Sequence, residues 1–298
     1  MILASNYVQS FLSYLQANRG YAKNTILAYG RDTMYFIVWL KGEGICEAAD
    51  IKEIHIRNYI AHFHQFKFSH STINRKIASL KHFTSYLYKI KIILVDPAKN
   101  FGWLKAAEPL PKAISETDIS TLIQAPDVNS FIGVRDRAML ELLYATGLRI
   151  SELIDLQYED VDLTRMCVKV INGKGGKQRL VPFNPNCLHW VETYILQRKH
   201  KKLSLDLRCL FVSQKGTKIT RQGFYHRLKK YVKQCNLSGD ISAHNIRHSF
   251  ATHLLDHGAD IRSIQLLLGH SDISSTEIYT HVAVKKLGEM HKKHHPRG

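Results

Sequence analysis

A set of cationic, imidazole and hydroxyl side chains in the second half of this 298-residue chain has the composition of a phosphate-handling site. Two arginines at one phosphate can each donate paired hydrogen bonds to its non-bridging oxygens and stabilise a pentacoordinate transition state. Lysine and histidine can move protons, and a tyrosine hydroxyl can attack phosphorus once nearby cations stabilise its phenolate. These types predict metal-free transfer of a nucleic-acid strand onto the protein. The residues are Arg149, Lys174, His244, Arg247, His270 and Tyr279.

Each of these residues has a more ordinary explanation when it is taken alone. A single arginine is more often a surface or ion-pair residue, and the chain offers 17 histidines and 14 tyrosines in which one member is more often structural. Lys174 stands between two glycines, where a nucleic-acid backbone can come close, but it could equally be the charged tip of a hairpin. Lys169 and Lys177 compete with it for the same role. The combination, and not any single member, carries the prediction.

No cofactor is expected from the remaining sequence. There is no cluster of carboxylates of the kind that holds magnesium, and no glycine-rich loop ending in Gly-Lys-Ser or Gly-Lys-Thr. A phosphotyrosyl ester would need neither, because transesterification keeps the bond energy for the return attack by a DNA hydroxyl. We therefore expect no metal and no nucleotide.

The charge of the chain favours a polyanionic partner. Lys and Arg number 42 against 25 Asp and Glu, which gives a formal net charge of +17 and a pI near 9.6. Residues 1–107 hold 14 basic and 6 acidic side chains, which leaves 28 and 19 for residues 108–298. The excess therefore covers both halves, as a nucleic-acid footprint would. Solubilising charge is the alternative explanation.

The cysteines and the N-terminal segment favour a cytoplasmic protein. The five cysteines form no Cys-x-x-Cys pair, so neither a disulfide framework nor a zinc cluster is expected. The first residues lack the basic start and unbroken apolar core of a signal peptide. No apolar run approaches the ~20 residues that a membrane helix needs. We predict a cytoplasmic protein with no membrane partner.

Apolar residues recur with helical spacing at four places in the first hundred residues. Asp96-Pro97 ends the last of these segments, and the stretch Glu-Pro-Leu-Pro at 108–111 is stiff and extended. The pattern predicts a four-helix domain over residues 1–107 and a second domain over residues 108–298. The expected helices lie around residues 8–15, 24–40, 56–63 and 73–83.

The second domain is expected to be mainly α with one small antiparallel sheet. Alternating residues from Met166 to Val170, a glycine-rich turn and a second short strand predict a β-hairpin with a basic tip. A capping pattern at Ser115 and a stop at Gly147 bound the first helices. Further helices are expected around 188–195, after Thr220, from Arg247 to Gly258 and from 260 to 269.

The last eight residues are polar and basic. Their histidines are predicted to form a solvated end of the chain rather than a metal site. They are His291, His294 and His295.

The motifs that hold the six residues resemble those of the tyrosine site-specific recombinases, in particular the Xer branch, over nearly the whole chain. ATGLRISEL matches the motif of the family's first arginine, GKGGK that of its hairpin lysine, and HNIRHSFATHLL its His-x-x-Arg motif. LGHS and IYTHV match the motifs of the last histidine and the nucleophile. The resemblance implies Arg149, Lys174, His244, Arg247, His270 and the nucleophile Tyr279 as catalytic residues, in that order.

The resemblance also implies an architecture and partners. An N-terminal core-binding domain and a C-terminal α+β catalytic domain would clamp double-stranded DNA, cleaving it through a 3′-phosphotyrosyl intermediate. A tetramer would exchange strands between two recombination sites, resolving chromosome or plasmid dimers at cell division. Whether two of the four subunits are a paralogous recombinase, and whether a DNA translocase activates the enzyme, stay open.

Two further readings accompany this resemblance. A type IB topoisomerase-like enzyme would use the same tyrosine chemistry and reseal the original strand, and a non-catalytic architectural DNA-binding protein would need only helices and charge. The helical N-terminal domain favours recombination, and the complete six-residue set favours catalysis.

Contacts to DNA are expected at helix starts and one basic helix face, although each could also be a solvated face. These residues are Lys23, Asn24, Thr25, Arg75, Lys76, Arg221 and Gln222.

Overall fold

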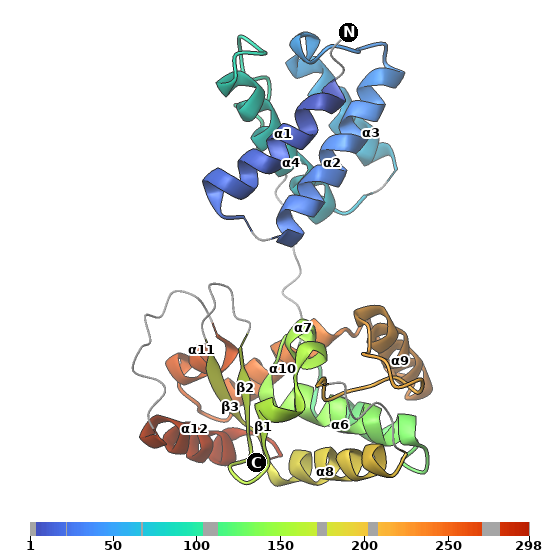
Figure 1. Ribbon diagram of the computed structural model, residues 1–298, viewed down its shortest axis with the longest axis vertical. Coiled ribbons are helices and arrows are strands. Elements are labelled where there is room, and N and C mark those ends of the chain that lie inside the picture. Colours follow the sequence, from blue (N-terminus) through green and yellow to red (C-terminus); the bar gives the residue numbers. More distant parts are fainter. Residues whose placement is uncertain are drawn as a thin grey trace. The chain divides into compact units, whose positions relative to one another are not determined.

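The computed structural model describes residues 4–21, 23–66, 68–103, 113–171, 178–201, 208–269 and 281–297. The chain forms two units, Met1–Pro109 and Leu110–Gly298 (Figure 1). Each unit has its own hydrophobic core. Within the described ranges, no helix combines the length and the apolar character needed to span a bilayer.

The described residues of the first unit form a bundle of four α-helices, as the periodicity predicts, with a short 3-10 helix η1 (Ala48–Asp50) between the second and the third (Figure 1). Its core is rich in aromatic rings, with Phe11, Phe36 and Phe83 fully buried and the rings of Phe11 and Phe83 in edge contact at 5.4 Å. Such pairs add a directional term to the burial of apolar surface. The helices are α1 (Ala4–Arg19), α2 (Lys23–Gly42), α3 (Glu53–Gln65) and α4 (His70–Lys89).

A buried ion cluster joins α2 to α4. Asp32 is 3% exposed and accepts hydrogen bonds from Arg75 and, at 3.3 Å, from the ammonium of Lys76. Lys76 is itself buried and lies over the rings of Tyr35 and Phe63. Its charge therefore stabilises the bundle and is not presented to solvent, whereas Arg75 keeps 43% of its side chain exposed.

The second unit is mainly α with a three-stranded antiparallel sheet, which confirms the expected fold class (Figure 1). Its described elements are α5 (Glu116–Gln124), α6 (Phe131–Thr146), α7 (Ile150–Asp155), η2 (Tyr158–Asp160), β1 (Val161–Asp162), β2 (Cys167–Val170), β3 (Arg179–Pro182), α8 (Pro185–His200), α9 (Arg221–Gln234), α10 (Ala243–Asp256), α11 (Ile261–Leu268) and α12 (His281–His294).

The sheet contains one strand more than the predicted hairpin. β2 pairs with β3 through Val168 and Val181, and β1 adds to the other edge of β2. β1 has only two residues, too few for an alternating pattern to be visible. Met166 precedes β2 with a left-handed backbone (φ +49°), so the strand begins one residue later than the alternation suggests.

Helix α10 begins four residues earlier than predicted. The predicted start was Arg247, but the first helical residue is Ala243 and the N-cap is Ser242. Ser242 donates its backbone N–H to Oδ1 of Asn245 at 3.1 Å, and its hydroxyl accepts from the N–H of Asn245, so the two residues cap each other. An asparagine in this reciprocal role hides the boundary in the sequence. The helix now includes His244, three residues from Arg247 and on the same face.

The prediction of a solvated C-terminal end is wrong. His291 and His295 are 2% and 5% exposed, and their rings stack at 4.6 Å beside Phe250. Nε2 of His291 donates to the carbonyl of Ala145 at 2.7 Å, which satisfies the buried imidazole. Burial lowers the pKa of His291 to about 4 and lowers that of His295 as well. The end of α12 is therefore part of the second core.

The buried histidines make stability depend on pH. At pH 7 His291 is neutral in the folded and unfolded chain, but below ~6.5 the unfolded chain gains a proton that the folded chain, with a pKa of about 4, excludes. We expect this residue alone to lower the free energy of unfolding by ~2 kcal/mol between pH 7 and pH 5. Urea denaturation at both pH values, followed through the unfolding transition of the second unit, measures the loss.

The variant His291→Gln, which keeps a donor but does not titrate, should lose ~2 kcal/mol less than the wild type over this interval. His226→Gln, at an exposed position on α9, should behave as the wild type does. Equal losses in His291→Gln and the wild type would contradict the prediction.

Candidate active site

The junction between α6 and α7 positions Arg149. Gly147 ends α6 in the left-handed region (φ +58°), and Arg149 is the N-cap of α7. Its backbone N–H donates to Oε2 of Glu152 at 2.8 Å, and its guanidinium donates to Oε1 of the same carboxylate at 2.9 Å. Because 43% of its side chain is exposed, the guanidinium keeps a face open to a ligand.

Arg247 reaches the same place from α10. It is 8% exposed, and its two Nη groups donate to the carbonyls of Gly147 and Leu268, at 2.5 and 2.8 Å. Its Nη1 lies 4.0 Å from Oε2 of Glu152. The two arginines predicted to share one phosphate are thus brought to a single carboxylate from two helices far apart in sequence, α7 and α10.

Glu152 and a third arginine, Arg179, were not among the residues that the sequence indicated. Arg179, at the start of β3, donates to both oxygens of Glu152 at 2.9 and 2.8 Å. The sequence did hold two signals for them. Glu152 stands three residues after Arg149, at capping-box spacing, and Arg179 shares its strand face with the buried Val181.

The electrostatics of this cluster favour an anionic ligand. Burial by itself raises the pKa of Glu152, but hydrogen bonds from Arg179 and the charge of that arginine outweigh it, so the net pKa is below its ordinary value. Burial, followed by the charge of Arg149, lowers the pKa of Arg247 to about 10. The cluster therefore sets three guanidiniums against one carboxylate. The excess of two positive charges is suited to the non-bridging oxygens of a phosphodiester.

His244 is exposed on the first turn of α10, beside Arg247 on the helix surface. Gly269, which ends α11 in the left-handed region (φ +68°), directly precedes His270 in the chain. The other three predicted catalytic residues lie outside the described residues: Lys174, His270 and Tyr279.

The predicted DNA contacts fall at several places. Asn24 and Thr25 lie in the first turn of α2, and Arg221 and Gln222 are exposed in the first turn of α9, after the N-cap Thr220. Helix N-termini favour phosphate through unpaired N–H groups and the helix dipole. The side chain of Lys23 lies outside the described residues, and Arg75 and Lys76 pair with Asp32 as described above.

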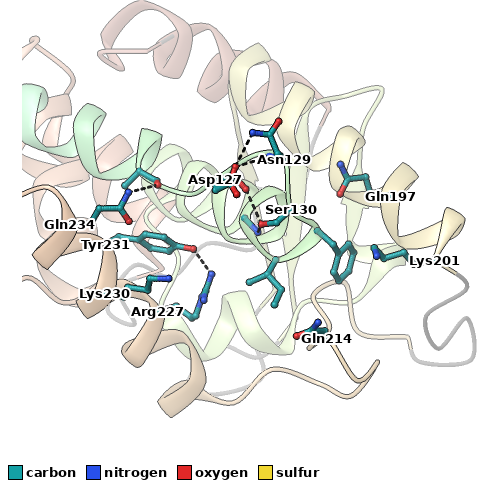
Figure 2. Close-up of a pocket in the computed structure, with 14 residues that line it drawn as sticks. Asp127, Asn129, Ser130, Gln197, Lys201, Gln214, Arg227, Lys230, Tyr231 and Gln234 are labelled. Carbon is teal, nitrogen blue, oxygen red and sulfur yellow. Dashed lines mark hydrogen bonds between the residues drawn. The ribbon is translucent and has the colours of Figure 1, made fainter.

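A hollow of about 920 Å³ in the second unit lies elsewhere, among the start of α6, the end of α8 and α9 (Figure 2). Neither Arg149, His244 nor Arg247 lines it. Several of its polar groups are already satisfied: Asn129 donates to Asp127, and Arg227 donates to the hydroxyl of Tyr231 at 2.6 Å (Figure 2). The arginine cluster, by contrast, has an open face, as a polymeric substrate requires.

Two family models match the chain. The phage integrase family matches residues 112–286, and the phage integrase N-terminal SAM-like domain matches residues 8–91. Together they cover both units and include the six predicted catalytic residues.

Relatives and solved structures agree with these models. The chain is 41% identical to a protein of Shewanella oneidensis and 40% identical to one of Pseudomonas putida, over 98% of this chain and 97% of each relative. Both are called tyrosine recombinase XerD, the subtype that the segment TRQGFYHRLK and the C-terminal residues also resemble.

Among solved structures, the XerH site-specific recombinase in a post-cleavage complex with a palindromic difH substrate has a TM-score of 0.72 at 20% identity, over 96% of this chain and 83% of that one. The Tn1549 transposon integrase in complex with circular intermediate DNA has a TM-score of 0.71 at 22% identity, over 94% and 97%. At these identities the likeness shows the fold. The matched models and the relatives show that this chain belongs to the phage integrase family, as a site-specific tyrosine recombinase of the Xer branch.

Proposed function

We propose that the chain cleaves and rejoins double-stranded DNA through a 3′-phosphotyrosyl intermediate on Tyr279. Arg149, Arg247 and His270 hold the non-bridging oxygens of the scissile phosphate. Lys174 is the general acid, and His244 handles the proton of the nucleophile. The observation that carries the proposal is the convergence of Arg149 and Arg247 on Glu152, which leaves a net positive cluster open on one side.

The proposed reaction conserves bonds and protons. The hydroxyl oxygen of Tyr279 attacks phosphorus and its proton passes to His244, while the bond from phosphorus to the 5′ oxygen breaks and Lys174 protonates that oxygen. The return attack by a DNA 5′ hydroxyl on the phosphotyrosine reverses each step and restores the tyrosine. The same cluster stabilises the pentacoordinate transition state in both directions.

A covalent adduct tests this proposal. The wild-type chain, incubated with a nicked suicide recombination site in EDTA, should form a protein–DNA adduct that denaturing electrophoresis resolves. Tyr279→Phe, which removes the attacking oxygen, should reduce adduct formation by 10³-fold or more, on the order seen when a nucleophile is lost.

Tyr158→Phe, which removes a hydroxyl from an exposed ring in the same unit, is the control and should form the adduct as the wild type does. Absence of an adduct from the wild type, or an adduct that survives Tyr279→Phe, would overturn the mechanism. An adduct that reseals without exchange between two sites would assign the topoisomerase reaction instead.

We assign DNA binding to both units. Arg75 on α4, the start of α2 at Asn24 and Thr25, and the start of α9 at Arg221 and Gln222 contact phosphates or groove edges. Exposure of Arg75, Arg221 and Gln222 supports this assignment. Lys23 belongs with them by its place at the start of α2, whereas burial of Lys76 against Asp32 leaves it a structural role.

The working assembly proposed is a tetramer on two DNA sites in the cytoplasm, resolving chromosome or plasmid dimers at cell division. Two copies would act with two of a XerC-like paralogue, under activation by an FtsK-like translocase. The similarity to relatives called tyrosine recombinase XerD is consistent with a Xer role, and the partners are what the resemblance to that branch implies. Strand exchange between inverted-repeat sites, measured with the chain alone and then with each candidate partner added, tests the assembly. Full exchange by the chain alone would remove both partners from the proposal.

A further inference from the structure

Arg179 is held on three sides inside the second unit. It is 8% exposed; its two Nη groups donate to the two oxygens of Glu152, and its Nε donates to the carbonyl of Leu267 at 2.8 Å. A planar guanidinium is suited to this paired geometry, and a lysine is not. One side chain of β3 thereby joins α7 to the end of α11.

The bonds to Glu152 saturate that carboxylate. Oε1 accepts from the guanidiniums of Arg149 and Arg179, and Oε2 accepts from the backbone N–H of Arg149 and from Arg179. A carboxylate offers about four acceptor sites, so each is filled. Arg247, at 4.0 Å, is near enough to feel the charge of Glu152 but donates no hydrogen bond to it at that distance. Its guanidinium is therefore left to bind other acceptors.

The hydrogen bond from Arg179 to the carbonyl of Leu267 also affects Arg247, through the end of α11. The next carbonyl, that of Leu268, accepts from Arg247 at 2.8 Å. Gly269 follows, and it packs so closely on Arg179 that a Cβ there would lie 3.0 Å from its Cδ and Nη1. Arg179 thus fixes the end of α11 on which Arg247 is anchored.

We propose that Arg179 is a positioning residue for cleavage, which saturates Glu152 and so keeps Arg247 free for the scissile phosphate. The inference rests on the proposed cleavage reaction. Without Arg179, two acceptor sites of Glu152 are vacant, and Arg247, whose Nη1 lies 4.0 Å from Oε2, is a charged donor placed to fill them. The guanidinium would then turn toward the carboxylate and away from the substrate.

Four chains test this: wild type, Arg179→Met, Arg179→Lys and the double variant Arg179→Met/Glu152→Gln. The readout is the single-turnover rate of adduct formation on the nicked site with enzyme in excess, together with the Kd for DNA. We expect Arg179→Met to slow cleavage ~100-fold with binding within about threefold, the scale of losing one transition-state donor. Arg179→Lys should lose ~10-fold, because it restores the charge without the paired geometry.

The double variant carries the decisive prediction. Removing the charge of Glu152 removes the competitor for Arg247, so the double variant should cleave at least ~10-fold faster than Arg179→Met, a coupling within the range measured for contacting residues. A merely structural arginine predicts the opposite order, because a second core substitution would add to the first. A double variant no faster than Arg179→Met would overturn the proposal, as would a wild-type rate in Arg179→Met.

Arg198→Met is the matched control for loss of a buried arginine. Arg198, on α8, is 7% exposed and donates to the carbonyls of Cys209 and Leu210 at 2.6 and 2.8 Å. It should lose stability but keep the wild-type cleavage rate per folded molecule, counted by circular dichroism. Absence of an adduct from the wild type would overturn the cleavage reaction itself; an active wild type with an unaffected Arg179→Met would overturn only this inference.

Discussion

Arg247→Lys is expected to lower the rate of adduct formation ~10³-fold while DNA binding stays within a few fold. The guanidinium has five donors, of which Gly147 and Leu268 accept two, so the rest remain for phosphate oxygens. An ammonium has three donors on one atom and cannot bridge both carbonyls and a phosphate. Lysine is the sharper test than alanine, because it keeps a cationic side chain at the site and leaves a smaller cavity.

The same variant should gain a pH dependence. Burial and the charge of Arg149 lower the pKa of Arg247 to about 10, so the wild-type residue is charged throughout the neutral range. The pKa of a lysine starts about two units lower and would meet the same environment. The residual rate of Arg247→Lys should therefore fall as pH rises from 7 to 9, more steeply than the wild-type rate, and single-turnover rates across that range measure it.

Arg135→Lys is the matched control. Arg135 is equally buried in the same unit but bonds to Asp136 and to the carbonyl of Val212. Its replacement should change stability and leave the cleavage rate of folded molecules near that of the wild type. A loss of DNA binding as large as the loss of cleavage in Arg247→Lys would reassign Arg247 from catalysis to recognition.

Gly147→Ala is expected to lower the free energy of unfolding of the second unit by ~3 kcal/mol or more, from left-handed backbone strain and overpacking together. The backbone at Gly147 has φ +58°, and a Cβ there would lie 2.4 Å from Cδ1 of Phe250, a fully buried ring. Urea denaturation measures the loss. Phe250 is on α10 with Arg247 and its ring packs beside His291 and His295, so we expect its displacement to disturb the helix that carries the site. Cleavage per folded molecule should fall as well.

Gly42→Ala, at the last residue of α2, is the control: a Cβ there meets open space, and its φ is not positive. It should be neutral or slightly stabilising. The double variant Gly147→Ala/Phe250→Leu should lose less than the sum of its single losses, because the smaller side chain relieves the contact. Equal stability of Gly147→Ala and Gly42→Ala would contradict the packing argument.

The sequence predicted those features that depend on neighbours along the chain. Helical spacing found the four helices of the first unit, and Ser115 does cap α5 by accepting from the N–H of Asp118 at 3.1 Å. Gly147 and Gly269 do end helices in the left-handed region. The motif order around Arg149 and Arg247 was enough to identify the family, which the matched models confirm.

The sequence did not predict which polar side chains are buried, because burial and pairing depend on segments far apart in sequence. The sequence predicted His291 and His295 in a solvated end of the chain, yet their rings lie against those of Phe250 and Tyr144. The sequence predicted Lys76 as a DNA contact on a helix face, but Asp32, 44 residues away, pairs with it inside the bundle.

By itself, then, the sequence of this protein determined the helices apart from α7 and α12, the strands of the hairpin, the residue types of the site and the family, since each is written in local spacing and motif order. Only the tertiary structure decided that Glu152 and Arg179 join Arg149 and Arg247 in one cluster. The physical reason is that Glu152 can be buried as a charge only where cations from separate elements saturate it, and no local pattern records that meeting of α7, β3 and α10.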